Sequence, residues 1–521
     1  MQMKIGRPAL VAIGGLLGVT PTGQALAQDA ARLAAIEAQI QSLQAELGRL
    51  RQDAARREAE ARSARQEAAA ARAEARSARQ TAAQVTALPP APAVVPAAAP
   101  AAPAEPQVRV SIPGGRPTIT SADGRFSASV GAQVHYDIGG YIRPGAGTPD
   151  QRGVPKMDTF GENLRRGRIL FSFRYDDFTL NVTPDFGGSP DGTVSLYEAN
   201  VNWNPVRPLT ITAGYFKPWI TLGDATSSNA FLFMERPSAV EIARNIAGGD
   251  ARASFGASWA DRRWFAAGYL TGAPFASQNV ALATPQQTGG TFRVAGRPIA
   301  SEDWDLHLGA SSSMAFDIGR TASGQTIQLR DRPELRIDQN RLIDTGALAA
   351  DRAYHWGPEF GLRWRNFLLQ GEYIRMAVDQ SKAGAAPRPE LQFSGGYVEG
   401  SWVMTGETRA YSTSSAAFGG VIPARPFSFR DGGMGAFELV GRYSVVDLND
   451  RVTRGRPASA TGGVFGGRQE VIGAGVNWYP NANFRVMLQW NNVKVDRLDA
   501  SGTTQIGQRF DTVAMRLQAA F

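Results

Sequence analysis

Short segments in which apolar and polar residues alternate recur through the C-terminal four fifths of the chain, and this alternation constrains the fold most. In residues 126–138 the even positions are apolar or aromatic, whereas the odd positions include Gln133 and His135. Residues 484–491 and 512–521 repeat the pattern. Because successive side chains of a strand point to opposite faces, a period of two predicts strands with one apolar face. Alternation over roughly ten residues, with aromatic residues near the strand ends, is typical of membrane barrels.

Sixteen such segments can be placed along the chain. Their expected bounds are 125–142, 161–175, 177–185, 194–204, 208–216, 252–260, 263–271, 290–299, 303–316, 354–364, 366–378, 391–404, 435–446, 468–479, 482–495 and 509–521. An even number of strands returns both chain ends to the periplasmic side, as bacterial barrels require. The sequence therefore predicts an all-β fold, a 16-stranded antiparallel transmembrane β-barrel, whose last strand ends at Phe521.

The connections between these strands alternate between short and long. Short connections such as Asp176-Asp177 are expected to be periplasmic turns. The long links fall on the opposite, extracellular side: 143–160, 217–251, 317–353 and 447–467. The link 405–434 is long and yet falls on the periplasmic side. Either the strand count slips there, or this segment folds under the barrel or into the pore.

The first 27 residues have the pattern of a secretory signal peptide. Lys4 and Arg7 precede the apolar run 9–19, and small residues at Ala25 and Ala27 predict cleavage after Ala27. No later stretch approaches the roughly 20 apolar residues that a transmembrane helix needs. The chain has no cysteine, which excludes disulfides and cysteine-ligated metals.

A coiled coil is predicted for residues 29–86. Apolar residues recur there at alternating spacings of three and four, which is a heptad seam. The large members of this seam are Leu33, Ile36, Ile40, Leu43, Leu47 and Leu50, and alanine continues it. A single solvated helix is the alternative. Residues 87–107 hold seven prolines among alanines, which favours an extended polyproline II linker. The expected order is signal peptide (1–27), periplasmic coiled coil (29–86), Pro/Ala-rich linker (87–107) and barrel (108–521).

Arginine carries most of the basic charge of the chain, whose formal net charge is +8. In the predicted strand 161–175, Arg166, Arg168 and Arg174 have the parity opposite to the apolar residues, so they are expected to point into the lumen. Rings and ladders of arginine favour anions, and each planar guanidinium offers several donors to an oxyanion. The alternative is that these arginines pair with lumen acids and only hold the wall. The candidate acids are Asp185, Glu198 and Glu438.

The segment 217–251 is the best candidate for a constriction of the pore. It contains Lys217, Arg236 and Arg244, with apolar residues between them that could seat an inward-folded loop against the wall. Arg236 is as well explained as a structural staple of the loop, with the adjacent Glu235 as its partner.

Five ordered motifs carry a resemblance to a known family. They are Gly214-Tyr-Phe-Lys-Pro-Trp-Ile, residues 226–237, Met404-Thr-Gly-Glu-Thr-Arg-Ala-Tyr411, residues 436–444 and Val476-Asn-Trp-Tyr-Pro-Asn481. Together they resemble the phosphate-selective porin O/P family of Gram-negative outer membranes, over most of residues 125–521. The resemblance implies a trimeric barrel, a third extracellular loop folded inward, and passage of anions, in some members with a phosphate preference.

One feature departs from that family. Its phosphate selectivity is associated with lysines at the narrowest point, and the predicted barrel has only four lysines: Lys156, Lys217, Lys382 and Lys494. Lys217 does stand where the family motif has its lysine, just after the fifth strand. The sequence therefore favours a weak anion preference, with phosphate specificity as a hypothesis.

The expected function is an outer-membrane porin for passive diffusion of small anions, with phosphate as one candidate. The alternative is a structural tether between the outer membrane and the cell wall, in which the coiled coil is the functional part. No Ser-His-acid set has the spacing of an enzyme, and neither a cofactor nor a metal is expected. The expected partners are small anionic solutes, outer-membrane lipid and two further copies of the chain, with cell-wall contact through the coil and no nucleic acid.

Overall fold

The computed structural model describes residues 108–142, 156–188, 194–275, 285–320, 324–382 and 388–521. The predicted signal peptide, coiled coil and linker lie outside these residues and stay predictions. Among the described residues, no helix has both the length and the apolar character to cross a membrane.

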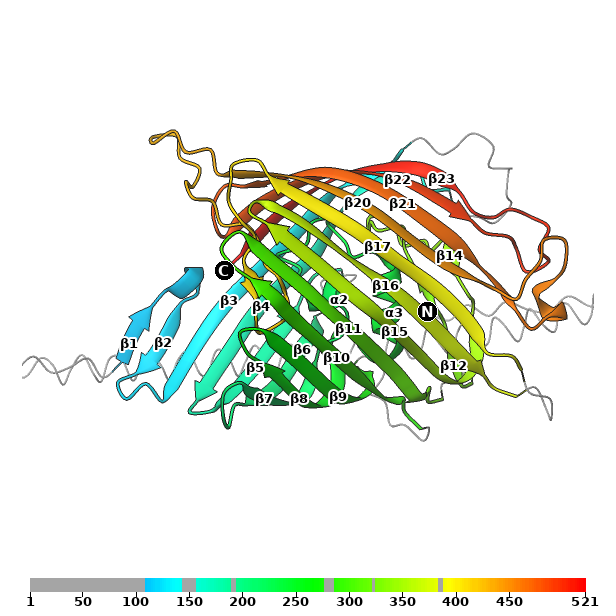
Figure 1. Ribbon diagram of the computed structural model, residues 1–521, viewed down its shortest axis with the longest axis horizontal. Coiled ribbons are helices and arrows are strands. Elements are labelled where there is room, and N and C mark those ends of the chain that lie inside the picture. The colour runs from blue at the N-terminus through cyan, green and yellow to red at the C-terminus, as the bar shows by residue number, and fades with distance from the viewer. Residues whose placement is uncertain (1–107, 143–155, 189–193, 276–284, 321–323, 383–387) are drawn as a thin grey trace, which may run out of the picture. The chain divides into compact units, whose positions relative to one another are not determined.

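Within the described residues, sixteen antiparallel strands form one closed barrel (Figure 1). They are β3 (Phe126–Ile142), β4 (Phe160–Tyr175), β5 (Phe178–Asp185), β6 (Ser195–Trp203), β7 (Leu209–Phe216), β8 (Arg252–Ala260), β9 (Trp264–Pro274), β10 (Thr288–Ala300), β11 (Trp304–Asp317), β15 (Leu348–Trp364), β16 (Phe367–Gln380), β17 (Leu391–Val403), β20 (Ala436–Asp450), β21 (Val464–Tyr479), β22 (Phe484–Asp496) and β23 (Arg509–Ala520). Each pairs with the next, and β23 closes the barrel on β3. All sixteen predicted strands are confirmed, and β15 is extended most, at its start.

The C-terminal residue is fixed at the seam where the barrel closes. Phe521 exchanges two backbone hydrogen bonds with Ala132 of β3, at 2.8 and 3.2 Å. Arg116 Nε also donates to the Phe521 carbonyl oxygen at 3.0 Å. Arg116 lies between β1 (Val108–Ser111) and β2 (Thr118–Ser121), a hairpin that extends the sheet before β3, with Thr118 opposite Ser129.

The outer face of the barrel is apolar and has a row of aromatic rings at its periplasmic end. Side chains at alternate positions, such as Leu488, are exposed on this face, as expected for a lipid-facing surface. The rings of Trp304, Trp364, Phe367 and Trp402 stack in sequence across β11 to β17, with centroids 5.7 Å apart at each step. Such a row is the aromatic girdle of a membrane barrel.

The link between β17 and β20 does not upset the strand count, because it folds partly into the barrel. It carries β18 (Tyr411–Ser412) and β19 (Ala417–Phe418), whose residues Ala417 and Phe418 are buried. The inserted hairpin is held by the wall, because Arg293 of β10 donates to the carbonyl oxygens of Ser415 and Ala416. The structure therefore supports the expectation that part of the link 405–434 enters the pore, and it does not support a slip in the strand count.

Two extracellular loops also fold into the barrel. The loop 217–251, the third on that side, carries α2 (Leu222–Ala225) and α3 (Ser238–Ala247). The loop 318–347 carries the short strands β12 (Thr326–Ile327), β13 (Arg330–Asp331) and β14 (Ile343–Asp344). The inward fold of the third loop agrees with the expectation from the resemblance.

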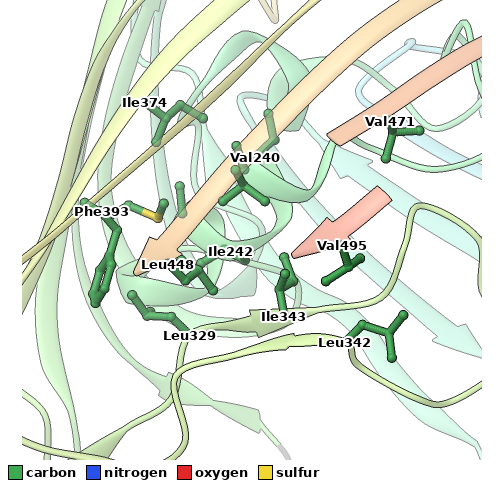
Figure 2. Close-up of a cluster of buried hydrophobic side chains, with 14 of the residues drawn as sticks. Val240, Ile242, Leu329, Leu342, Ile343, Ile374, Phe393, Leu448, Val471 and Val495 are labelled. Carbon is green, nitrogen blue, oxygen red and sulfur yellow. The ribbon is translucent and has the colours of Figure 1, made fainter. Parts of the chain in front are cut away.

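These two loops share a hydrophobic core with the inner wall (Figure 2). Val240 and Ile242 of α3 and Ile343 of the loop 318–347 pack among inward-facing apolar residues of the strands. The wall contributes Ile374, Phe393, Leu448, Val471 and Val495. Full burial stabilises each such side chain by roughly 1.5–3 kcal/mol. The core therefore holds both loops against the wall.

Candidate solute pathway

The lumen has two parts of different character. The filled half is bounded by β11 to β23 and contains α3 and the loop 318–347. The open half is bounded by β5 to β9 and contains a cavity of about 380 Å³. The beginning of the third loop and the inserted hairpin of the link, including Ser412 and Phe418, complete its lining. The open half is therefore the candidate pathway for solutes.

Uncharged polar side chains form one wall of this cavity. Asn200 Oδ1 accepts hydrogen bonds from Asn181 Nδ2 at 3.2 Å and from Asn202 Nδ2 at 3.1 Å. Thr212 Oγ1 donates to Asn202 Oδ1 at 2.7 Å. These side chains alternate with the lipid-facing residues of β5, β6 and β7, which is why they point inward. Their amides and hydroxyls can replace part of the hydration of a passing solute.

Arg168 points into the lumen from β4, as its parity predicts. Its Nε lies 2.6 Å from Asp185 Oδ2, and its guanidinium carbon lies 3.4 Å from the centroid of the Tyr197 ring. Asp185 is one of the acids considered as a partner for the ladder. Its carboxylate offsets the charge of Arg168, and the side chain both holds the wall and borders the cavity residue Tyr197.

Arg166 also points inward but has no acidic partner. Its Nη1 donates to His135 Nδ1 at 3.1 Å, and among the described residues no carboxylate lies within ion-pair distance of it. Because Nδ1 accepts this bond, His135 is neutral and its Nε2 donates to Asn229 Oδ1 of the third loop at 3.0 Å. Arg166 is buried, and its Nε has no hydrogen-bond partner. Its positive charge is therefore not offset locally.

Arg174 lies at the mouth of the barrel, at the end of β4 and next to the turn that follows it. It is exposed and donates to Ser127 Oγ at 3.3 Å and to the Gly124 carbonyl oxygen at 2.9 Å. Its guanidinium can attract anions to the periplasmic entrance.

Lys217 lines the open cavity at the start of the third loop. Its Nζ donates to the Asp224 carbonyl oxygen at 2.5 Å and lies 5.9 Å from the centroid of the Trp219 ring. Burial lowers the pKa of the Lys217 ammonium to about 8. Lys217 is thus a cation that faces the pathway and that titrates near neutral pH.

Arg236 and Arg244 are fastened inside the third loop and do not line the cavity. Arg244 lies 2.6 Å from Asp224 and 2.7 Å from Asp250. Arg236 donates to the Gly223 carbonyl oxygen at 3.0 Å and lies 3.5 Å from Asp224. In this geometry both arginines act as staples that fix the shape of the loop.

The adjacent Glu235 is not the partner of Arg236. Its carboxylate lies 2.7 Å from Arg165 of β4, 2.8 Å from Arg516 of β23 and 3.3 Å from Arg336 of the loop 318–347. This carboxylate therefore ties the third loop to two strands and to a second loop, and the predicted pairing with its neighbour in the chain is wrong.

The ion pairs of the filled half join residues of different strands and loops. Glu438, a candidate partner for the ladder, lies 2.6 Å from Arg409 of the link. Arg442 pairs with Glu399 at 2.6 Å and with Glu334 of the loop 318–347 at 3.1 Å. The sequence did contain one signal of the filled half itself. Near their extracellular ends, several strands are apolar at successive positions. Such runs indicate a strand that is covered on both faces.

The charged residues of the cavity lining are Lys217 and Glu198, and further charges lie on the inward side of the neighbouring strands. Among the described residues, the inward side of β4 to β8 carries five arginines: Arg165, Arg166, Arg168, Arg174 and Arg252. It carries two carboxylates, Asp185 and Glu198. Glu198 accepts from Thr183 Oγ1 at 2.9 Å and has no cation within ion-pair distance among these residues.

The chain resembles curated relatives and solved outer-membrane proteins. An uncharacterized protein of Caulobacter vibrioides is 29% identical over 441 residues, which are 80% of this chain and 78% of that protein. Porin O of Pseudomonas aeruginosa is 24% identical over 429 residues, 77% of this chain and 90% of the relative. The outer membrane channel DcaP of Acinetobacter baumannii has a TM-score of 0.46 at 11% identity, covering 77% of this chain and 99% of that one. An anion-selective porin from Comamonas acidovorans has a TM-score of 0.42 at 12% identity, covering 76% and 100%.

The family model of phosphate-selective porins O and P matches residues 129–521. The match begins within β3 and runs to the last residue, so it covers almost the whole barrel. The chain is an outer-membrane porin, and it belongs to the family of phosphate-selective porins O and P.

Proposed function

We propose that small anions diffuse passively through this porin along the open half of its lumen. The observations that carry the proposal are two cations. Lys217 lines the cavity, and Arg166 of the adjacent strand β4 is buried without a carboxylate within ion-pair distance among the described residues. The fixed positive charge lowers the energy of an anion in the pathway and raises that of a cation.

The preference for anions is expected to be weak. The cavity lining includes asparagine, threonine and the carboxylate of Glu198, and Lys217 is its one lysine among the described residues. Arg168 keeps Asp185 as a partner, and Arg236 and Arg244 are used within the third loop. The family name keeps phosphate as a candidate solute, but this arrangement favours general anion passage over a dedicated phosphate filter.

A reversal-potential measurement in a planar bilayer tests the proposal. The full-length protein is placed between KCl solutions that differ tenfold in concentration, and the sign of the potential reports whether chloride or potassium passes more easily. We expect chloride preference, and we expect Arg166→Gln to lower the chloride-to-potassium permeability ratio by about twofold. Arg454→Gln, on the exposed extracellular loop 451–463, is the matched control and should leave the ratio unchanged.

Phosphate is tested separately on the same bilayers. Phosphate is added to a chloride solution, and the chloride current is followed. A block at low phosphate concentration would show a phosphate site. A current that only reflects the mixture of ions would reject phosphate specificity and leave general anion passage intact.

The assembly and the N-terminal region complete the proposal. The resemblance implies a homotrimer, and three adjacent N-termini could then wind the predicted coil in the periplasm. Cross-linking of full-length and coil-deleted protein tests whether the coil contributes to the trimer. We propose no enzymatic activity. A barrel without measurable conductance would favour the alternative, a tether to the cell wall.

A further inference from the structure

Part of the link between β17 and β20 stays outside the barrel. After the inserted hairpin, residues 422–435 form what we call the aromatic lobe, which emerges at the barrel end that holds the C-terminus (Figure 1). Four of its apolar side chains are exposed, and Phe429 is the extreme case at 94%. The others are Ile422, Phe427 and Met434. Exposed apolar groups gathered in one place mark contact with a partner or a membrane.

The backbone holds these side chains in position. Phe427 N donates to the Pro480 carbonyl oxygen at 2.7 Å, which fastens the lobe to the turn between β21 and β22. Ser428 N donates to the Gly433 carbonyl oxygen at 3.0 Å and closes the lobe on itself. At its base, Val421 is buried in a small apolar cluster. Phe429 is therefore exposed on a segment whose backbone is held in place by hydrogen bonds.

The lobe continues the lipid-facing aromatic girdle. The Phe427 ring meets the Trp478 ring edge to face, with centroids 5.4 Å apart, and Trp478 stacks on Phe437 at 6.1 Å. Trp478 Nε1 donates to the Met434 carbonyl oxygen at 2.8 Å. Trp478 and Phe437 have the outward parity of β21 and β20, so they belong to the surface that faces lipid. The apolar patch of the lobe is continuous with that surface.

Two arginines accompany the exposed rings. Arg425 and Arg430 are exposed, and neither forms an ion pair with another described residue. The acidic residue of the lobe, Asp431, accepts a hydrogen bond from Ser428 Oγ at 2.8 Å. Aromatic rings with neighbouring arginines are characteristic of protein surfaces at the depth of lipid headgroups, where the cations meet phosphate groups.

We propose that the aromatic lobe docks on the headgroup region of the periplasmic leaflet. Phe429 and Met434 enter the boundary between headgroups and acyl chains, and Arg425 and Arg430 bind lipid phosphates. The lobe and the inserted hairpin belong to one link. Docking of the lobe on the membrane therefore also fixes the position of the hairpin at the periplasmic end of the barrel.

Single-cysteine labelling tests the proposal cleanly, because the chain has no cysteine of its own. Phe429→Cys in the full-length protein is labelled with bimane and reconstituted into phosphatidylcholine vesicles that contain phosphatidylglycerol. Quenching by nitroxide-labelled lipid is compared with quenching by aqueous iodide. Leu488→Cys on the lipid-facing wall and Arg454→Cys on the extracellular loop provide the lipid and water references. Bilayer conductance confirms that each variant is folded.

The outcomes separate lipid from the other occupants. We expect nitroxide lipid to quench the label at Phe429 at least half as strongly as the label at Leu488. Quenching by iodide alone, as at Arg454, would place the lobe in water and overturn the proposal. Protection from both quenchers would show that protein covers the lobe, such as a second copy of the chain, and would also overturn it.

The role of the arginines is tested in the same background. Adding Arg425→Gln and Arg430→Gln should weaken nitroxide quenching most in vesicles with phosphatidylglycerol, because the headgroup of phosphatidylcholine carries no net charge. Equal quenching in both kinds of vesicle, with or without the arginines, would contradict the binding of anionic headgroups by the lobe.

Discussion

The two halves of the lumen are bounded by strands of one barrel and yet have different linings. In the filled half, inward-facing residues such as Phe393 and Val471 are apolar because two loops cover them. In the open half, residues at the same parity, such as Asn200 and Thr212, are polar and line the cavity. Cations differ in the same way. Arg516 is fully offset by Asp137 and Glu235, whereas Arg166 has no acidic partner among the described residues.

This difference shows that an inward arginine in a porin is not by itself a pore charge. A guanidinium with a buried carboxylate on each side contributes little net field, and its role is to hold segments together. For a guanidinium without a carboxylate partner, such as Arg166, we propose that the charge acts on the pathway. The partner of each cation, and not its parity, decides its role.

The largest expected effect comes from opening the filled half. Val240→Asp places a carboxylate among apolar side chains of the core, where an uncompensated charge costs several kcal/mol. We expect α3 to leave the wall and the bilayer conductance to rise severalfold. Asn245→Asp introduces the same charge on the exposed side of the same helix and should leave the conductance unchanged. A folded Val240→Asp protein with normal conductance would show that the filled half does not restrict the lumen.

The second largest effect is expected on stability, where replacing a paired cation should cost more than replacing an unpaired one. Arg516→Met leaves Asp137 and Glu235 without their shared cation, and breaking a buried pair costs roughly 3–5 kcal/mol. Arg166→Met leaves no carboxylate unpaired, so its loss should be smaller. Thermal unfolding of the two variants in detergent measures this order. Equal melting temperatures would contradict the distinction between offset and free cations.

For ion selectivity the order should be reversed, so that replacing the unpaired cation has the larger effect. Arg442 lies in the filled half with Glu399 and Glu334, so Arg442→Gln is expected to leave the reversal potential almost unchanged. Arg166→Gln should lower the preference for chloride, as proposed above. A larger shift for Arg442→Gln than for Arg166→Gln would mean that ions pass through the filled half.

The smallest expected effect is a pH dependence from Lys217. Burial lowers the pKa of its ammonium to about 8, so the side chain is mostly charged at pH 7 and mostly neutral at pH 9. The chloride preference should therefore fall as the pH rises through this range. Lys217→Met should remove this dependence and give the lower preference at both values. The same pH dependence in Lys217→Met would assign the titration to another group.

The sequence was sufficient for the strands and for the direction in which their side chains point. Alternation is a local property, so it predicted all sixteen strands and the inward parity of Arg166 and Arg168. The partners of the cations were not predictable in this way, because they depend on contacts across the barrel. Asp137 and Arg516 are 379 residues apart and meet only because β23 closes on β3.

The path of the inward segments was only partly predictable. Length and parity singled out the link 405–434, and the apolar residues of the segment 217–251 indicated an inward loop. That the loop 318–347 joins the same core was missed, since its apolar residues show no period that distinguishes a covered loop from an exposed one. The apolar inner face of the strands opposite it, including Val493 and Val495, was the available signal.

The account rests on the claim that solutes pass through the open half. Asn202→Cys places a thiol in the lining of the open cavity, and Val471→Cys places one in the core of the filled half. An anionic thiol reagent, a methanethiosulfonate that carries a sulfonate, is added to single channels of each variant. We predict that the current falls in Asn202→Cys and stays unchanged in Val471→Cys. A fall in Val471→Cys with no change in Asn202→Cys would contradict the account.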